Sequence, residues 1–233
     1  ESTIDTLPDS TFMSGAMGLQ AIDNDIYFIE RSSKQLIKLD KGFNDNQRIG
    51  EWGAGPQELT DPINFFILNE LYYIIDIGST SIKYFSPQNK FMGSEKVSSF
   101  SEQRVFVYDN HLYMASFNRK SKECYTRINI DTYENDWVAE SFGESFEFEN
   151  SLQNIIRNKR DLLRSGDFFY SISDNQPIIE KYNIRDNSMV ESFDYSFVAM
   201  IKDNLKIIDA KSEGPNSYTA FVRDSYIYND AIY

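Results

Sequence analysis

Short runs in which apolar and aromatic residues alternate with polar ones recur along this chain. Each run follows a polar turn. The runs occupy residues 23–30, 68–76, 109–117 and 165–173, with a partial copy at 228–233. Alternation with a period of two is typical of a half-buried β-strand, so the pattern predicts a chain built of strands.

A second run of the same kind follows each of the first four. These second runs lie at residues 34–40, 80–86, 124–131 and 178–186. The short polar connection between the two runs of a repeat suits a hairpin turn. We therefore expect each repeat to contain an antiparallel pair of strands, followed by a more variable return.

An aromatic residue near the centre of each first run marks the length of the repeat. Tyr27, Tyr72, Tyr113 and Phe169 are separated by 45, 41 and 56 residues. A strand-rich repeat of about 40–50 residues is typical of a β-propeller blade, whereas a helical solenoid would show a 3.6-residue period throughout. The 15 Tyr and 18 Phe also favour strands, and the sequence predicts an all-β propeller.

Two apolar stripes depart from the strand pattern. Within residues 150–167 one helical face would carry Leu152, Ile155, Ile156, Leu162 and Leu163. This spacing predicts one short helical insertion, which would explain the longest repeat interval. A second stripe, which fits a helix or a pair of short strands equally well, consists of Phe197, Ile201, Leu205 and Ile208.

The stretch "IGEWGAGPQELTDP" at residues 49–62 resembles a phosphate-binding loop at first sight. Its last glycine, Gly55, is followed by Pro56 instead of Lys and Ser or Thr, and the residues after Pro62 are strand-like. Proline also lacks the backbone N–H that such a loop directs at phosphate. We interpret the stretch as a linker that crosses from the first repeat to the second.

The same residues carry a resemblance to a known family. The motif is followed by a strand that ends in Asp76 and by "SIKYF", and it consists of Gly50, Gly53, Gly55, Pro56, Glu58, Leu59 and Pro62. It resembles the linker of NHL-type propellers, and most of all the six-bladed propeller proteins of Bacteroidetes. The resemblance covers residues 21–134 and departs from the family pattern at Gln57, where glycine is common. The resemblance implies that the residues of the motif have structural roles and that Asp76 accepts hydrogen bonds from backbone amides of a turn.

The resemblance also implies a ring of six blades and a place in the cell envelope. We expect one propeller domain over residues 1–233, and its repeats lie at approximately 13–62, 63–102, 103–164 and 165–222, with another starting at 223–233. Because a propeller must close, we expect the native polypeptide to continue by about one and a half to two further blades. The implied location is extracytoplasmic, in the periplasm or as an outer-membrane lipoprotein anchored through a cysteine upstream of Glu1.

Charge and rare residues narrow the chemistry. A net charge of −13 argues against nucleic acid or an anionic membrane as partner, and no apolar run is long enough to span a bilayer. Cys124 is alone and is expected to be a strand residue. His111 is also alone, which excludes a multi-histidine zinc site within this sequence and favours an exposed turn residue.

Candidate binding residues combine aromatic rings with carboxylates. The segment 135–150 contains Trp137, Phe142 and Glu144 within an acidic–aromatic sequence that could hold a sugar, a peptide or a cation. Alternatively it is a solvated loop whose aromatic side chains pack under a blade. The insertions at 135–165 and 187–220 are the expected recognition loops. Trp52 is expected to cover the interface between the first two repeats, and would be a ligand platform if exposed.

Three classes of function remain open. The first is a non-enzymatic binding scaffold of the bacterial cell envelope, with an unidentified protein, peptide or glycan ligand. The second is a propeller enzyme, a lyase or lactonase-like hydrolase with calcium in the central channel, although no D-x-D-x-D-G spacing marks a calcium loop. The third is a structural assembly subunit. No residue is assigned a catalytic role and no cofactor is expected.

Overall fold

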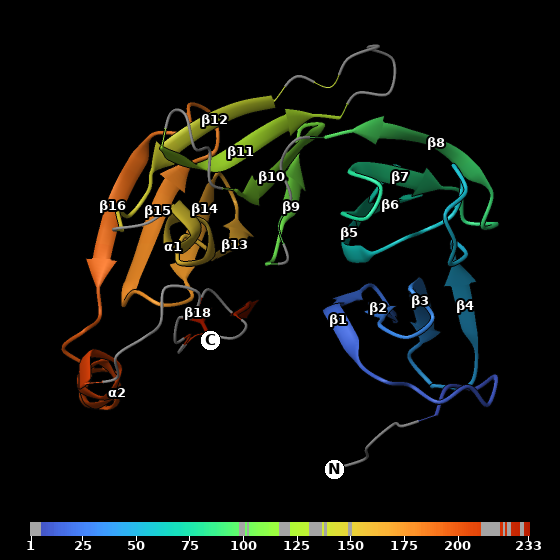
Figure 1. The fold of residues 1–233 in the computed structure, drawn as a ribbon, viewed down its shortest axis with the longest axis horizontal. Helices are drawn as coiled ribbons and strands as arrows, with labels where there is room; N and C mark the ends of the chain where they lie inside the picture. The colour runs from blue at the N-terminus through green and yellow to red at the C-terminus, as the bar shows by residue number, and fades with distance from the viewer. Residues whose placement is uncertain are drawn as a thin grey trace. The chain divides into compact units, whose positions relative to one another are not determined.

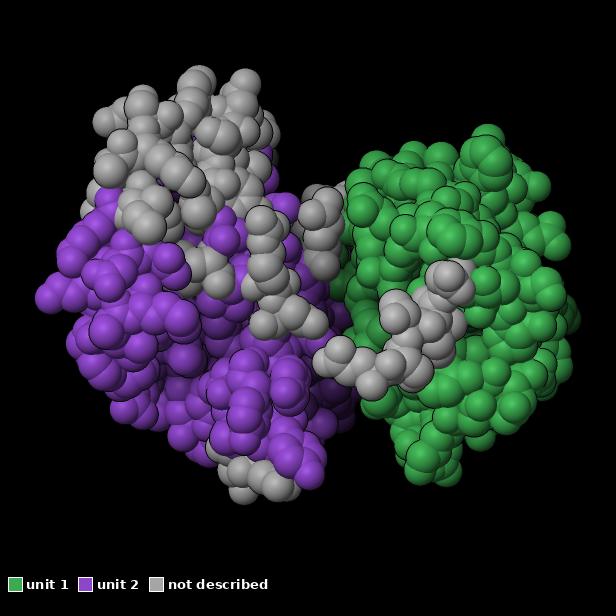
Figure 2. All heavy atoms as spheres, turned by 90° about the horizontal axis from the view of Figure 1, so that it is seen from below, with its two compact units in different colours: residues 1–102 green, residues 103–233 purple. Residues whose placement is uncertain are grey.

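The computed structural model describes a chain of two compact units. The described residues are 6–97, 101, 103–116, 122–130, 137, 139–148, 151–210, 220, 222, 225–228 and 231–233. The two units are residues 1–102 and 103–233, coloured green and purple in Figure 2. Each contains two four-stranded antiparallel sheets (Figure 1).

Unit 1 contains the first and second sheets. The strands of the first sheet are β1 (Ala16–Ile22), β2 (Asp25–Glu30), β3 (Gln35–Asp40) and β4 (Asn46–Ile49). Those of the second are β5 (Pro62–Leu68), β6 (Leu71–Asp76), β7 (Ser81–Phe85) and β8 (Phe91–Lys96). In both sheets the spatial order of the strands is their order along the chain.

Unit 2 contains the third and fourth sheets, two helices and a hairpin. The third sheet consists of β9 (Phe106–Tyr108), β10 (His111–Ala115), β11 (Glu123–Asn129) and β12 (Ala139–Glu144). The fourth consists of β13 (Arg160–Ser165), β14 (Phe168–Ser173), β15 (Ile178–Asn183) and β16 (Met189–Asp194). The remaining elements are α1 (Ser151–Ile156), α2 (Ala199–Ala210) and the hairpin of β17 (Ile227–Tyr228) with β18 (Ala231–Ile232).

The strand pairs predicted from the alternation are confirmed. In the four sheets the pairing sets Tyr27 opposite Lys38, Tyr72 opposite Phe85, Tyr113 opposite Arg127 and Phe169 opposite Tyr182. Each pair forms the middle of a sheet, with one further strand on either side. A four-stranded antiparallel meander is the blade of a β-propeller, so the predicted fold class is confirmed, with four blades in the described part of the chain.

The helical expectation for residues 150–167 is correct only at its start. The helix α1 ends at Ile156, and Leu162 and Leu163 lie in β13. The Asn158 side-chain amide donates to the Asn154 carbonyl near the end of the helix (2.7 Å), and β13 then pairs with β14. Two consecutive leucines fit one face of a helix and also fit a strand that is buried on both faces. The pairing of β13 with β14 makes them strand residues. The expected boundary between residues 164 and 165 therefore falls inside a strand.

The two segments expected to be recognition loops contain regular structure instead. Residues 139–144 form β12, the outer strand of the third sheet, and residues 189–194 form β16, the outer strand of the fourth. Three residues of the second stripe, Ile201, Leu205 and Ile208, lie in the helix α2, whereas Phe197 lies just before it.

Aromatic and aliphatic side chains form the core of each unit. In unit 1, Tyr27 lies 6.4 Å from Phe65 and 6.1 Å from Tyr72 (ring centroids), which joins the first sheet to the second. In unit 2, Phe169 stacks on Tyr182 at 4.9 Å. Such ring contacts add to the stabilisation from burial of apolar area.

A buried ionic network ties the third and fourth sheets together within unit 2. Arg160 pairs with Glu180, and Tyr125 donates to the same carboxylate at 2.6 Å. The guanidinium also lies over the rings of Tyr125 and Phe146. Beside this network Cys124 is fully buried, in strand β11 as expected, and burial raises the pKa of its thiol to about 11.

A second buried ion pair lies in unit 1, between Asp76 and Lys83 (3.1 Å). Asp76 also accepts hydrogen bonds from the amides of Thr60 (3.2 Å) and Asp61 (2.7 Å) and from the hydroxyl of Ser79 (2.6 Å). Burial alone would raise the pKa of Asp76, but the bonds from Ser79 and the two amides lower it below its usual value. The carboxylate is therefore charged at neutral pH.

We predict that Asp76→Ala lowers the free energy of unfolding by about 3 kcal/mol, because it leaves the Lys83 ammonium buried without its counter-ion. Urea denaturation followed by circular dichroism measures the change. Asp203→Ala is the control, because it removes an exposed i,i+3 pair with Lys206 and should cost no more than about 0.5 kcal/mol. Equal losses in the two variants would contradict the interpretation.

We also predict that stability falls in acid through Glu30. This carboxylate is 1% exposed and accepts bonds from the amides of Ser33 (2.6 Å) and Ser14 (3.0 Å) and from the Ser14 hydroxyl (2.7 Å). Burial alone would raise its pKa, but these bonds hold it at about 2, below the usual 4.5.

A lowered pKa in the folded state gives stability that is complete above pH 4.5 and is lost as the pH falls toward 2. The loss is about 1–3 kcal/mol over that range, and Glu30→Gln should flatten this part of the curve of unfolding free energy against pH. If the slope of unfolding free energy against pH is unchanged in the variant, the loss of stability in acid belongs to other groups.

Candidate functional site

The linker between the first two sheets is held by a dense set of backbone contacts. The Gly50 amide donates to the Asn89 side-chain oxygen (2.7 Å), and its carbonyl accepts from the Gln35 side-chain amide (2.7 Å). Further along, the Leu59 amide donates to Glu51 O (2.7 Å) and the Gly53 amide to Leu59 O (3.1 Å). The linker therefore folds back on itself and leaves Leu59 fully buried.

Glu58 fixes the turn of this linker. Its carboxylate accepts the Gly55 amide at 2.7 Å, and its own amide donates to the Gly55 carbonyl at 3.0 Å. A Cβ atom at Gly53 would lie 2.0 Å from the same carboxylate, so a larger residue there would displace the Glu58 side chain from this position. The carbonyl of Glu58 in turn accepts from the buried Lys83 ammonium.

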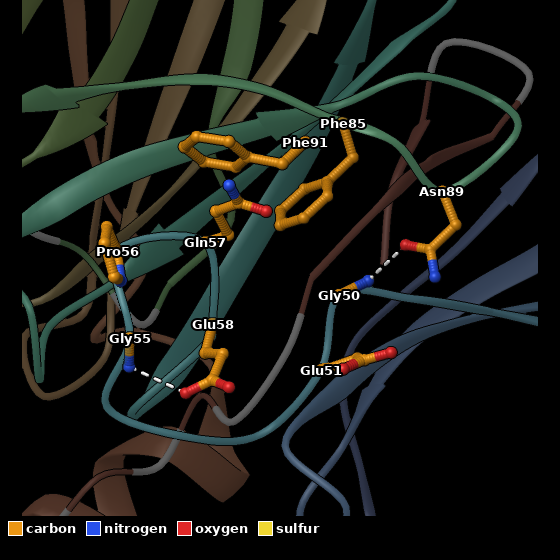
Figure 3. Close-up of a pocket in the computed structure, with 9 residues that line it drawn as sticks. All are labelled: Gly50, Glu51, Gly55, Pro56, Gln57, Glu58, Phe85, Asn89 and Phe91. Atoms are coloured by element: carbon orange, nitrogen blue, oxygen red, sulfur yellow. Dashed lines mark hydrogen bonds between the residues drawn. The ribbon is translucent and has the colours of Figure 1, made fainter.

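These contacts shape a hollow of about 350 Å³ on unit 1, here named the linker hollow. Its lining residues are Gly50, Glu51, Gly55, Pro56, Gln57, Glu58, Phe85, Asn89 and Phe91. In Figure 3 the Gln57 side chain lies beside the rings of Phe85 and Phe91, and the Glu51 and Glu58 carboxylates lie on the other side. Aromatic rings, an amide and carboxylates thus line one concave surface.

The charge of the linker hollow restricts what it can hold. Its lining contains two carboxylates, Glu51 and Glu58, and no lysine or arginine. An anionic ligand would be repelled at this short range, so the surface suits a neutral or a cationic group. The rings and the amide suit a ligand with both apolar and hydrogen-bonding faces.

A second hollow of similar volume is less suited to a ligand. It is lined by Met17, Arg31, Lys34, Asp61, Ile63 and Ile77. Here Lys34 is already paired with Asp61. The charges that could attract a ligand are therefore partly neutralised by each other.

The structure changes the interpretation of Trp52. The indole is 68% exposed, so it does not cover an interface within unit 1. It follows Glu51 of the linker hollow, and its backbone bridges to Leu59. Trp52 does not line the hollow, and its role as a ligand platform stays a prediction.

The other three candidate residues belong to unit 2 and lie in or near the third sheet. Phe142 packs against Tyr113, Tyr125, Phe169 and Tyr182, with ring centroids 5.4–6.4 Å apart. Trp137 is partly exposed, and Glu144 ends β12 with its carbonyl accepting from the Cys124 thiol (3.1 Å). The ring of Phe142 therefore takes part in the core of unit 2.

The rest of the acidic–aromatic segment packs on arginines. Phe146 lies 4.5 Å from the Arg160 guanidinium and Phe148 lies 5.1 Å from that of Arg157. Cation–π contacts of this kind stabilise a folded surface and leave little of the rings for a ligand. Packing against the sheet explains these aromatic residues better than recognition does.

Metal and membrane sites find no support in the described parts of the chain. His111 is partly exposed at the start of β10, with its ring Nδ1 2.6 Å from the Asp109 carbonyl. No group of three or more His, Cys, Asp or Glu side chains within the described ranges could hold a metal ion. None of the helices in those ranges is long and apolar enough to cross a membrane.

The far wall of the linker hollow was not predicted from the sequence. Phe85, Asn89 and Phe91 lie some thirty residues beyond the glycines, at the end of one strand and the start of the next. In the sequence they look like core and turn residues. The polar turn between two aromatic residues was the one available sign.

Comparisons with known proteins agree with the β-propeller fold. No protein-family model matches the chain, and no curated protein sequence matches it. The structure is similar to virginiamycin B lyase from Staphylococcus aureus, with 8% sequence identity and a TM-score of 0.51, covering 80% of this chain and 57% of that one. It is also similar to the Cps50 (Swd1) β-propeller domain of Myceliophteria thermophila, with 9% identity and a TM-score of 0.50, covering 77% and 55%.

A protein of Bacteroides fragilis described as exported matches 97% of this chain and 80% of its own, with 12% identity and a TM-score of 0.45. The chain thus spans a little over half the length of the lyase and of the fungal domain. At these identities the similarities show the fold alone.

We predict that Gly50→Ala destabilises unit 1 beyond the cost of its backbone conformation. Gly50 has φ of 78°, and an added Cβ would lie 2.3 Å from Leu59 Cδ1. Gly166→Ala is the matched control, since its φ is 59° but nothing lies within 4 Å of the added atom. We expect a loss of about 1 kcal/mol for Gly166→Ala and about 2 kcal/mol more for Gly50→Ala, measured by urea denaturation. Equal losses of unfolding free energy in the two variants would mean that the linker accommodates the added Cβ atom without strain.

Proposed function

We propose that this chain is a non-enzymatic binding module of the bacterial cell envelope and that the linker hollow holds a glycan. The observation that carries the proposal is the lining of the hollow. It combines the partly exposed ring of Phe91, which packs on the buried Phe85, with the side-chain amide of Gln57 and two carboxylates. Aromatic faces pack on the C–H surfaces of a sugar ring, while amides and carboxylates bond its hydroxyl groups.

The sign of the charge narrows the class of glycan. Glu51 is exposed at the edge of the hollow, whereas Glu58 is engaged by the Gly55 amide. Both would repel the carboxylate of a uronic or sialic acid and attract the ammonium of an amino sugar. The proposed ligand is therefore a neutral or amino sugar.

The proposed location rests on the linker motif. The spacing from Gly50 to Pro62 resembles that of the Bacteroidetes propeller proteins, and this resemblance implies a place in the cell envelope. The absence of paired cysteines is compatible with that location.

The test is a glycan array, followed by calorimetric titration of the sugars that bind. Phe91→Leu keeps the apolar packing against Phe85 (5.7 Å) but removes the flat ring, and should weaken binding about fivefold. Gln57→Ala changes an exposed amide and should weaken it by a similar factor. Met92→Ala is the control, since Met92 is next in the same strand, is 48% exposed and does not line the hollow.

A further variant tests the charge argument separately. Glu51→Gln should narrow the preference for neutral over uronic-acid sugars, because one of the two repelling carboxylates is gone. The proposal fails if no sugar on the array binds, or if Phe91→Leu and Met92→Ala have the same effect.

A further inference from the structure

The outer strand of the fourth sheet and the helix that follows it expose an unusual amount of apolar surface. Five large side chains, each between 49% and 70% exposed, define what we name the β16–α2 surface: Met189, Val190, Phe193, Phe197 and Met200. All five lie within twelve residues. Isolated exposed apolar residues are ordinary, but a continuous group on one element indicates an interaction site.

A ring contact joins the strand part of this surface to the residues that lead into α2. The ring of Phe193 in β16 lies 6.0 Å from that of Phe197, edge to face. The Tyr195 amide donates to the Pro177 carbonyl (2.8 Å), and the Val198 amide donates to the Tyr195 carbonyl (3.1 Å). The end of the strand is thereby joined to the start of α2, which follows β16 in Figure 1.

The outer strands of the other three sheets differ from β16. In β4 all four residues are at least partly buried, and β8 has one strongly exposed apolar residue, Met92, in a strand that also contains Gly93 and Lys96. In β12 the exposed Glu140 is paired with Arg127 of the neighbouring strand. Edge strands are normally protected in such ways against pairing with other chains. In β16 all six residues are exposed and none is Lys, Pro or Gly; its protective features are two acidic residues, Glu191 and Asp194, and a register shift at Val190.

One edge of β16 has no paired strand among the described residues. The order of the fourth sheet is β13–β14–β15–β16, and β16 pairs with β15 alone among the described strands. Its other edge presents backbone N–H and C=O groups to any extended segment that adds as a fifth strand.

The charges on this edge specify the chemistry of such a segment. Glu191 and Asp194 are the charged residues of β16, and no Lys or Arg occurs between Arg185 and Lys202. Lys181 of β15 is opposite Glu191 in register, and its ammonium lies over the ring of Phe168. Cross-strand pairs favour opposite charges and apolar neighbours. The complementary segment therefore has basic residues opposite Glu191 and Asp194, and apolar residues opposite Met189, Val190 and Phe193.

A second copy of this chain is a poor partner for the same reason. In an antiparallel pair of β16 strands centred on Glu191, the two glutamates would lie opposite each other. Centred one residue later, Phe193 would face Glu191, and Val190 would face Asp194. Both registers place carboxylates against like charges or apolar side chains, which is unfavourable.

We infer that β16 accepts an extended, basic and apolar segment of another protein as a fifth strand. The main-chain bonds would hold the segment, and the exposed apolar residues with the two carboxylates would select it. This interaction is separate from the linker hollow, which lies on unit 1, and either can fail without the other.

The test uses a fluorescein-labelled peptide of sequence Lys-Val-Thr-Lys-Val-Val, titrated with the whole chain and followed by fluorescence anisotropy. Two control peptides separate the contribution of charge from that of main-chain pairing. In one, Glu replaces both Lys residues; in the other, alternate backbone nitrogens are methylated, which prevents strand pairing. The Lys peptide should bind at least about tenfold more tightly than either control peptide.

Protein variants then locate the site. Phe193→Lys puts a positive charge on the exposed strand and should weaken binding about tenfold. Met92→Lys makes the same change on the outer strand of the second sheet and should leave binding within about twofold. Circular dichroism and urea denaturation check that both variants are folded.

Equal binding of the three peptides would overturn the inference, as would an unchanged affinity in Phe193→Lys. Sedimentation of the unmodified chain provides a further test. A dimer that Phe193→Lys dissociates would make a second copy of this chain the occupant of β16 and would also overturn it.

Discussion

The buried carboxylate of Asp76 is the interaction on which the organisation of unit 1 depends. It holds the amides of Thr60 and Asp61, where the chain enters the second sheet, and neutralises the Lys83 ammonium. Lys83 in turn donates to the carbonyl of Glu58, whose carboxylate shapes the turn at Gly55. A chain of polar contacts thus extends from the core of the sheet to the wall of the linker hollow. The hollow keeps its shape because the charges beneath it are buried and satisfied.

Much of the fold could be predicted from the sequence because it depends on local periodicity. The alternation around Tyr27 and Tyr72 identified the central strand pairs, since a period of two is specific to a sheet with distinct faces. The failure at Leu162 and Leu163 has the same origin. Adjacent leucines satisfy a helical face as well as a strand buried on both sides, and only pairing with β14 distinguishes the two.

The candidate site was less predictable because it joins residues distant in sequence. The glycines of the linker showed where the chain turns sharply, but the surface that they meet is made by Phe85 and Phe91 of the next sheet. The acidic–aromatic segment at residues 135–150 was hard to interpret from the sequence for a related reason. Phe142 and Phe146 lie in contact with Tyr125 and Arg160, and no pattern in the sequence indicated those partners. Composition can suggest binding chemistry, but packing decides which rings remain available.

The two buried ion pairs have a consequence for the history of the repeats. Lys83 precedes Phe85 by two residues in β7, and Glu180 precedes Tyr182 by two in β15, so the two positions are equivalent in register. One carries a cation paired with Asp76, and the other an anion paired with Arg160. Asp76 and Lys83 lie in the same β6–β7 hairpin and would move together, whereas Arg160 lies in β13, outside the β14–β15 hairpin that carries Glu180. A β6–β7 hairpin placed by recombination in the position of β14–β15 would therefore set Lys83 beside Arg160. The blades have thus diverged into parts that are no longer interchangeable, and any further duplication must carry both members of an ion pair together.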